Sequence, residues 1–448
     1  MPDPIRDELI VDLFAGGGGA SQGIWQALGR HPDIAVNHDP LAIGIHRVNH
    51  PDTHHACASV WHVEPRRAVA GRPVGLLWAS PDCRHFSRAA GGRPRWASVR
   101  SLPGVVITWA TRVRPRVIVV ENVREMLSWG PLLAGGTPDP DRIGRSWNWW
   151  IGRLRGLGYR VQWRALCAAD FGAPTIRTRL FVVARCDGAP IVWPAPTHAR
   201  QPSMFERPWR TAAECIDWSI PCPSVFTRPR PLADATLRRI ADGVRRYVLG
   251  AGEPFIVSLT HHGGFRGQAL TEPLATLTCA NRGEKALVAA SIAQHNGGAV
   301  GRAANEPLSA ITTRGTQQQI VTARLSLDDE VGARRVAAFL ISYYGQGAQH
   351  QDLRAPLGTV TTRDRFALVI VDGVPTPIVD IGMRMLTPAE LAHAQGFPDG
   401  YALDHRPDGT PVSKTHQVRL IGNSVCPPVA EAVVLAQFAA SAAEAQAA

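Results

Sequence analysis

The sequence contains few cysteines, and none is spaced as in a disulfide framework or a zinc site. Eight cysteines occur in 448 residues, and no Cys-x-x-Cys pair is present. This usage argues against a secreted disulfide scaffold and against a structural metal site. His54, His55 and Cys57 cluster locally but lack partners at zinc spacing, so we expect no bound metal. A reduced, cytoplasmic protein is the expectation.

Long apolar runs are also missing. No apolar stretch follows a charged start, and no run approaches the roughly 18 apolar residues of a membrane span. We therefore expect neither export nor membrane insertion. Lysine is scarce too, with only Lys285 and Lys414 among 48 basic residues. We attribute this skew to a GC-rich genome rather than to function.

Positive charge is abundant and unevenly distributed. The formal net charge is +11 and the pI is about 9.8, which favours a nucleic-acid partner. Residues 84–116 include no acidic residue and eight arginines: Arg84, Arg88, Arg93, Arg95, Arg100, Arg112, Arg114 and Arg116. With Gly91 and Gly92, the first part of this stretch is expected to close over a substrate while its arginines contact phosphates. A merely solvated basic loop is the alternative.

One cysteine directly follows a predicted buried strand. In GLLWASPDCRHFS, residues 75–87, an apolar run leads into a turn that carries Cys83. The carboxyl end of a strand is where α/β enzymes hold reactive groups. Arg84 and Arg88 would favour the thiolate, which is the nucleophilic form of cysteine. The alternative is a buried, inert cysteine.

A glycine-rich turn follows the first predicted strand. IVDLFAGGGGAS, residues 10–21, passes from an apolar strand through four glycines into a helix-compatible stretch. Such a turn suits a ligand at a helix N-terminus, but NAD, FAD and S-adenosylmethionine sites and plain turns all use one. The next strand, IAVNHDP, ends in His38 and Asp39, the candidates for holding a ribose.

Two further predicted strands carry charged groups. RVIVVENV ends in Glu121, and in DFGAPTIRTRLFVVA the side chains of Arg177 and Arg179 alternate on a strand and so point the same way. Parallel strands ending in the glycine turn, Cys83 and Glu121 would place all three at one sheet edge. A carboxyl group there can move a proton, and two guanidinium groups suit a phosphate or a base oxygen. The alternatives are a strand-capping surface glutamate and arginines on an exposed edge strand.

In this order, the segments resemble the cytosine-C5 DNA methyltransferase family. LTPAELAHAQGFPDGY and QVRLIGNSVCPPVAEAV, near the end of the chain, are similar to that family's last two blocks. The resemblance implies an α/β fold with a doubly wound, Rossmann-like methyltransferase lobe, the cofactor S-adenosyl-L-methionine and duplex DNA as substrate. It implies that Cys83 adds to C6 of a flipped-out cytosine, that Glu121 engages the N3 edge, and that Arg179, beside Arg177, holds the ring oxygen.

The same resemblance assigns cofactor-binding positions. These are Phe14, Ala15, Gly16, Gly18, Gly19, His38, Asp39, Ser59, Val60, Pro81, Asn423, Ser424 and Val425. Five positions depart from the family pattern. Asp82 and Arg84 flank the nucleophile in place of proline and glutamine, His38 stands where a ribose-binding glutamate is usual, and Ser59 replaces the acid that faces the adenine. Thr175 replaces the glutamine before the two arginines.

The expected organisation is a catalytic domain interrupted by a second domain. Residues 1–199 and 381–448 form the catalytic domain, and residues 200–380 form a β-rich target-recognition domain. Within it, EPLATLT, EPLSAIT and APLGTVT each follow a glycine turn, which suggests three similar β units. Duplication of a plain β scaffold would give the same pattern. Residues expected to contact DNA are Arg84, Ser87, Arg88, Arg93, Arg95, Arg314 and Arg363.

Two other functions remain open at this point. An RNA cytosine methyltransferase could use the same catalytic lobe, although the large middle region favours DNA. A non-catalytic DNA-binding relative is the other alternative, against which the combination of Cys83, Glu121 and Arg179 argues. We also expect a monomer in a bacterial or phage-infected cell, with a cognate restriction endonuclease as a possible companion.

Overall fold

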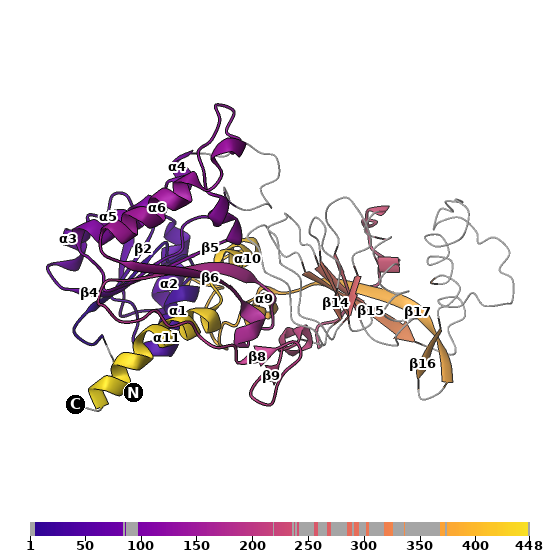
Figure 1. The fold of residues 1–448 in the computed structure, drawn as a ribbon. Helices are drawn as coiled ribbons and strands as arrows, with labels where there is room; N and C mark the ends of the chain where they lie inside the picture. The colour runs from indigo at the N-terminus through magenta and orange to yellow at the C-terminus, as the bar shows by residue number, and fades with distance from the viewer. Residues whose placement is uncertain are drawn as a thin grey trace.

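The computed structural model describes residues 5–83, 86, 97–217, 219–234, 237, 240–241, 336 and 374–446, together with the strand segments between 255 and 371 named below. Figure 1 shows a lobe in which helices surround a central sheet and, beside it, a second β-rich region.

A seven-stranded sheet forms the centre of the first lobe. Its strands are β1 (Leu9–Leu13), β2 (Ile34–Asn37), β3 (His54–Cys57), β4 (Val74–Ala79), β5 (Val117–Asn122), β6 (Arg160–Cys167) and β7 (Thr178–Arg185). Their order is β3-β2-β1-β4-β5-β7-β6, and only β7 runs antiparallel to its neighbours. The predicted doubly wound α/β architecture is confirmed. Because β1, β4 and β5 are parallel neighbours, their carboxyl ends meet at one edge.

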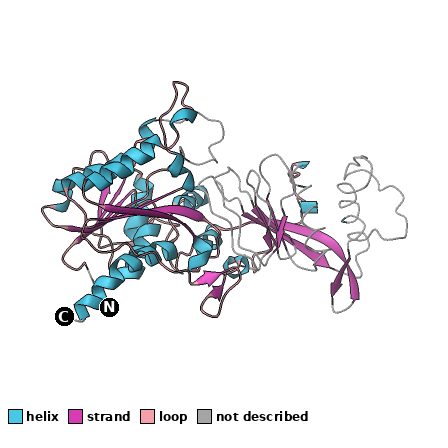
Figure 2. Cartoon of the chain, in the orientation of Figure 1, coloured by secondary structure: helices cyan, strands magenta, loops and turns pink. Residues whose placement is uncertain are grey.

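Helices cover both faces of this sheet (Figure 2). The described helices are α1 (Gly19–Leu28), α2 (Pro40–Asn49), α3 (Pro65–Val69), α4 (Ala97–Arg100), α5 (Gly104–Arg112), α6 (Arg145–Gly156), α9 (Pro388–Ala394), α10 (Lys414–Asn423) and α11 (Pro427–Gln446). Short 3-10 turns are η2 (Arg124–Ser128), η3 (Pro140–Arg142), η4 (Ala168–Phe171) and η5 (Ala212–Cys215). Alternate strand residues face opposite sides, so Val11 packs with α5 and α6 while Ile10 packs with α1 and α11.

The last helix lies directly against the first. A Cβ atom on Gly23 of α1 would stand 2.5 Å from the Cβ of Ala430 in α11, so only glycine permits this approach. One helical stretch, Lys414–Phe438, is long and apolar enough to cross a membrane by composition. Its most apolar window is 67% buried inside the fold, as in the core helix of a folded domain.

The second region contains an eight-stranded sheet. Its described strands are β10 (Phe255–Ser258), β11 (Gly267–Ala269), β12 (Lys285–Val288), β13 (Ser291–Gln294), β14 (Arg302–Ala303), β15 (Gln318–Leu325), β16 (Leu368–Val371) and β17 (Val374–Met385). A small pair, β8 (His198–Ala199) and β9 (Arg207–Pro208), lies before it in sequence. β17 pairs with β15 as far as Met385 and leads directly into α9, so one strand joins the two regions. The three Pro-Leu segments of the suggested repeat lie outside the described residues.

Candidate active site

The turn that carries Cys83 is held from two sides. Ser80, directly after β4, donates its backbone N–H to the carbonyl oxygen of Leu13 at 3.2 Å. The amide of Asn122, at the end of β5, donates to the carbonyl oxygen of Pro81 at 2.8 Å. These bonds join the carboxyl ends of β1, β4 and β5 around the partly exposed thiol of Cys83. Asn122 is 1% exposed, so its role is to fix the turn.

Glu121 and Arg179 form an ion pair beside this turn. The Nε atom of Arg179 lies 3.3 Å from Oε1 of Glu121, whose residue is 7% exposed. Burial raises the pKa of Glu121 above its ordinary value, while Arg179 and Arg177 act in the opposite direction. A carboxyl group with a raised pKa holds its proton more readily and can donate it to a bound ligand.

The thiol of Cys83 is influenced by the same charges. Burial raises its pKa, and the negative charges of Glu121 and Asp82 add to that effect. Arg179 and Arg177 lower the pKa without reversing the net rise. Arg84, the arginine that follows Cys83 in sequence, lies outside the described residues. In the part of the chain that the structure describes, the thiol form of Cys83 is favoured, and Arg179 is the strongest opposing charge.

Arg177 departs from the predicted geometry. β7 begins at Thr178, so the expectation that both arginines alternate on a strand is wrong for Arg177. It is 3% exposed, and its Nη1 donates to the carbonyl oxygen of Gly422 at 3.1 Å. Burial, and secondarily Arg179, lowers its pKa to about 10. Arg177 thus ties the strand entry to the C-terminal segment while remaining within electrostatic reach of Cys83.

The glycine loop adopts an unusual backbone conformation. Phe14 has φ +65°, in the left-handed region, and Gly16 and Gly18 have φ +56° and +94°. Residues other than glycine rarely adopt this conformation, and those that do are often found at ligand-binding sites. Ala15 donates its N–H to the carbonyl oxygen of Val36 at 3.1 Å, which joins the loop to β2.

The C-terminal block meets this loop. A Cβ atom on Gly19 would stand 2.0 Å from Oγ of Ser424 and 2.3 Å from the carbonyl oxygen of Val425. Glycine is therefore required at the start of α1 so that Ser424 and Val425 can approach. Asn423, the last residue of α10, directly precedes Ser424 and is exposed.

The remaining cofactor candidates lie along the same strand ends. His38 is exposed after β2. Asp39 caps α2 by accepting from the N–H of Leu41 at 2.9 Å, and its other oxygen pairs with Arg419 at 2.7 Å. Ser59 and Val60 follow β3, and Val60 is buried. The carboxylate of Asp39 is thus already engaged by the protein on both oxygens.

The candidate DNA contacts are not described by the structure. Arg84, Ser87, Arg88, Arg93, Arg95, Arg314 and Arg363 all lie outside the described residues. Two arginines of the basic stretch have internal roles instead. Arg100 is 4% exposed and donates to the carbonyl oxygen of Gly130, and Arg116 pairs with Glu8. The phosphate contacts are expected of the loop before Arg100, whose arginines lie outside the described residues.

Sequence reasoning missed a group of histidines behind the glycine loop. His31, His46, His50 and His55 form hydrogen-bonded pairs, and His50 also contacts Tyr401. The available signal was the density of histidine, with six between residues 31 and 55. Only a metal site was considered there. Among the described residues, no group of three His, Cys, Asp or Glu side chains is arranged to hold a metal ion.

The family model for C-5 cytosine-specific DNA methylase matches residues 9–208 and 302–438. The chain belongs to this family. Type II methyltransferase M.AgeI of Thalassovita gelatinovora is 29% identical over 210 residues, covering 44% of this chain and 46% of that protein. Type II methyltransferase M.AquIA of Picosynechococcus is 26% identical over 263 residues, covering 54% of this chain and 99% of that protein. The chain thus spans about half of one such relative and nearly all of another.

Two solved methyltransferase structures resemble the fold of this chain over 96% of its length. A variant of Spodoptera frugiperda DNMT2 superposes with a TM-score of 0.52 at 15% identity, covering 96% of this chain and 99% of the other. The Dnmt2 methyltransferase of S. pombe also gives 0.52, at 13% identity, with 96% and 98% covered. At this identity the likeness concerns the fold alone.

Proposed function

We propose that this chain is a DNA (cytosine-5-)-methyltransferase that transfers a methyl group from S-adenosyl-L-methionine to C5 of a flipped-out cytosine in a specific duplex DNA sequence. The observation that carries the proposal is the grouping of Cys83, Glu121 and Arg179 where β4 and β5 end and β7 begins. Family membership and the Type II methyltransferase names of the relatives support it. A binding protein would gain nothing from placing a thiol, a buried carboxyl group and a guanidinium together.

The chemistry follows from covalent catalysis. The sulfur of Cys83 forms a bond to C6 of cytosine, and the displaced electron pair makes C5 nucleophilic. C5 would then form its bond to the methyl group as the bond between that group and the donor's sulfonium sulfur breaks, with the electron pair left on that sulfur. A base removes the C5 proton, the C5–C6 double bond returns, and the S–C6 bond breaks with its electron pair on sulfur. S-adenosyl-L-methionine, when bound, supplies the methyl group.

The electrostatics of the three side chains suit these steps. Protonated Glu121 would donate to N3 of the cytosine ring, for which its raised pKa is favourable. Arg179, which lies beside Glu121, would donate to O2, the carbonyl oxygen of the cytosine. Because the pKa of Cys83 is raised, the thiol must lose its proton when the cytosine enters the site. The positive charge of Arg179 favours that loss.

The glycine loop and its surroundings fit the proposed cofactor. A Cβ atom on Gly16 would meet only the carbonyl oxygen of Phe14, at 3.7 Å, so this side of the loop is open. Asp12 Oδ1 and Ser424 Oγ are buried oxygens without a hydrogen-bond partner in the part of the chain that the structure describes. Such oxygens can accept from the amino and hydroxyl groups of a ligand. The residues that would hold it are Phe14, Ala15, Gly16, Gly18, Gly19, His38, Asp39, Ser59, Val60, Pro81, Asn423, Ser424 and Val425.

Partners and location follow from the proposed activity. Duplex DNA is the proposed substrate, with residues 200–380 as the target-recognition domain and Arg314 and Arg363 among its contacts. We place the activity in the cytoplasm of a bacterial or phage-infected cell, in a monomer, with a restriction endonuclease as a companion. The Type II names of the relatives support that last element.

The decisive experiment is base-resolution 5-methylcytosine sequencing of plasmid DNA from cells that express the wild type or Cys83→Ser. Methylation in one sequence context, absent in the variant, is expected. No methylation by either protein would contradict the proposal, and methylation of transfer RNA instead would indicate the RNA alternative. Methylation that persists in the variant would overturn the role of Cys83.

A further inference from the structure

Two chains of hydrogen bonds run behind the glycine loop. In the first, Nδ1 of His31 lies 2.9 Å from Nδ1 of His50, and Nε2 of His50 lies 3.2 Å from the hydroxyl of Tyr401. That hydroxyl donates to the carbonyl oxygen of Gly17 at 2.7 Å. The chain therefore ends on the backbone of the loop itself. It joins α2, the loop and a segment nearly 400 residues away, since His50 caps α2 and Tyr401 follows α9.

The second chain ends on β1, just before the loop. Nε2 of His55 lies 2.8 Å from Nδ1 of His46, whose Nε2 lies 2.8 Å from Oγ of Ser21. Ser21 donates to Oδ2 of Asp12 at 2.6 Å. His46, Ser21 and Asp12 are all 0% exposed. The rings of His46 and His50 have centroids 4.5 Å apart, so the two chains also pack against each other.

Each chain has one direction of donation. Because the Tyr401 hydroxyl donates to Gly17, Nε2 of His50 must donate to Tyr401, and Nδ1 of His50 must accept from His31. The same reasoning makes His46 donate to Ser21 and accept from His55. These assignments require both inner imidazoles to be neutral. Burial lowers the pKa of His50 to about 3 and that of His46 well below its usual value, so both stay neutral at ordinary pH.

Gly18 packs closely against both His50 and Tyr401. A Cβ atom at Gly18 would stand 2.2 Å from the Tyr401 hydroxyl and 2.9 Å from Nε2 of His50. The loop backbone, with φ +94° at Gly18, is thus in contact with both side chains. Loss of one hydrogen bond would leave a buried donor or acceptor unpaired, which is unfavourable. A shift of the loop is the means of relieving that cost.

We propose that His50 and Tyr401 are positioning residues for the donor-binding loop, which they hold in shape through the directed chain from His31 to Gly17. Neither touches the reacting atoms in this assignment. The inference rests on the proposed function, because it concerns affinity for S-adenosyl-L-methionine. It goes beyond that function by making donor affinity depend on hydrogen-bond direction behind the loop.

The test uses variants that separate hydrogen bonding from shape. In His50→Gln the amide oxygen can accept from His31 and the amide nitrogen can donate to Tyr401, whereas His50→Leu can do neither. Tyr401→Phe removes only the hydroxyl. His54→Gln, at an exposed position on β3, is the matched control. The measurements are the KM for S-adenosyl-L-methionine and for DNA, kcat, thermal unfolding, and calorimetric binding of S-adenosylhomocysteine.

We expect His50→Leu and Tyr401→Phe to raise the KM for the donor, and the dissociation constant for S-adenosylhomocysteine, by about tenfold. The KM for DNA and kcat at saturating donor should stay within about twofold, and His50→Gln should restore most of the donor affinity. Folded His50→Leu and Tyr401→Phe proteins that bind the donor like the wild type would overturn the inference alone. So would a His50→Gln defect equal to that of His50→Leu. A wild type that binds neither ligand would overturn the proposed function, and the inference with it.

Discussion

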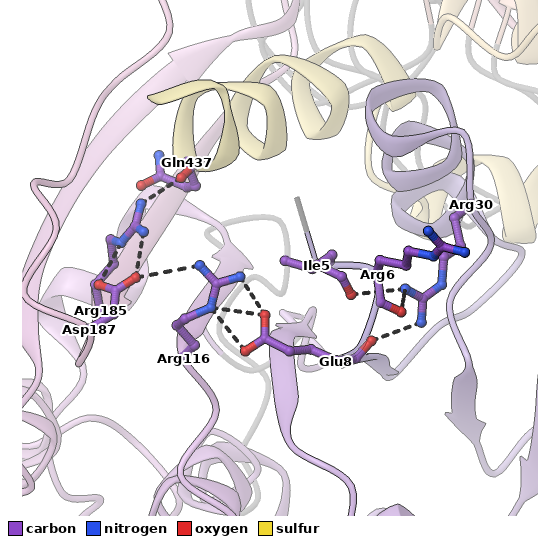
Figure 3. A network of polar contacts seen from close by, with 8 residues as sticks. All are labelled: Ile5, Arg6, Glu8, Arg30, Arg116, Arg185, Asp187 and Gln437. Carbon is purple, nitrogen blue, oxygen red and sulfur yellow. Dashed lines mark hydrogen bonds and ion pairs between the residues drawn. The ribbon is translucent and has the colours of Figure 1, made fainter. Parts of the chain in front are cut away.

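At the amino end of the central sheet, Arg116 and Arg185 each meet an acidic partner, whereas at the carboxyl end Cys83 and Glu121 are held in environments that oppose their charged forms. Figure 3 shows the amino end. Nε of Arg116 lies 3.0 Å from both carboxylate oxygens of Glu8, just before β1. Arg185, at the end of β7, binds both oxygens of Asp187, at 3.1 and 2.6 Å, and the carbonyl oxygen of Gln437 in α11.

The carboxyl end is built differently. There Nε of Arg179 lies 3.3 Å from Glu121, and burial shifts the pKa of Cys83, Glu121 and Arg177 toward the neutral forms. Cys83 and Glu121, the side chains that we propose to change protonation state, lie at this end. We therefore expect the amino end to stabilise the fold and the carboxyl end to give up stability for the proposed chemistry.

The largest effect is expected at the nucleophile. Cys83→Ser should lower the single-turnover rate of methyl transfer by at least about 10³-fold, because a serine hydroxyl is a far weaker nucleophile. Its urea unfolding midpoint should be nearly unchanged. Cys57→Ser, at an exposed position, is the control for loss of a thiol. A Cys83→Ser rate within tenfold of the wild type would remove Cys83 from the mechanism.

The amino end should show the reverse behaviour. Arg185→Met removes a buried guanidinium, 4% exposed, and leaves Asp187 and a carbonyl oxygen with a lost partner. We expect the free energy of unfolding to fall by about 3 kcal/mol. The rate of methyl transfer per folded molecule should stay unchanged. Arg112→Met, on the exposed side of α5, should change stability little, and a rate loss in Arg185→Met without destabilisation would break the contrast between the two ends.

Glu121→Gln tests the contrast between activity and stability at a single residue. The amide can donate a hydrogen bond but cannot move a proton, so the methyl-transfer rate should fall by about 100-fold. Stability should be equal or higher at neutral pH, because the variant no longer buries an ionisable carboxyl group whose pKa is raised. Urea unfolding and single-turnover kinetics on the same preparation would measure both. A variant that is much less stable than the wild type would show that the Arg179 ion pair supports the fold.

Much of this site could be predicted from local sequence. Strand, turn and reactive residue are contiguous around Cys83 and Glu121, and hydrophobic runs place their strands side by side. Arg177 could not be placed, because its position depends on a bond to Gly422 that no local pattern encodes. Tyr401 and His50 were missed for the same reason. Their contacts join segments far apart in sequence, and only the packed fold brings them together.

The smallest expected effect is at Asp12. This residue lies in β1, just before the glycine loop at the carboxyl end of the sheet. It is fully buried, burial raises its pKa from 3.8 to about 7, and only the bond from Ser21 opposes that rise. The folded state therefore holds the proton more tightly than the unfolded chain does. The resulting stabilisation is complete below about pH 3.8 and is lost as the pH rises to about 7. The side chains that face Asp12 are Ser21 from α1, which also binds His46 of α2, and Tyr401 after α9.

Asp12→Asn removes this titration. Relative to the wild type, its free energy of unfolding should rise by about 1–2 kcal/mol at pH 8 and by much less at pH 5, since the full pKa change sets an upper limit of about 4 kcal/mol and the new amide gains an unpaired donor. Urea unfolding at the two pH values, with the exposed Asp141→Asn as control, makes the measurement. An equal gain at both values would mean that Asp12 stays ionised in the fold. The carboxylate would then have a partner near the loop, and the contrast between paired and unpaired ends of the sheet would fail at this residue.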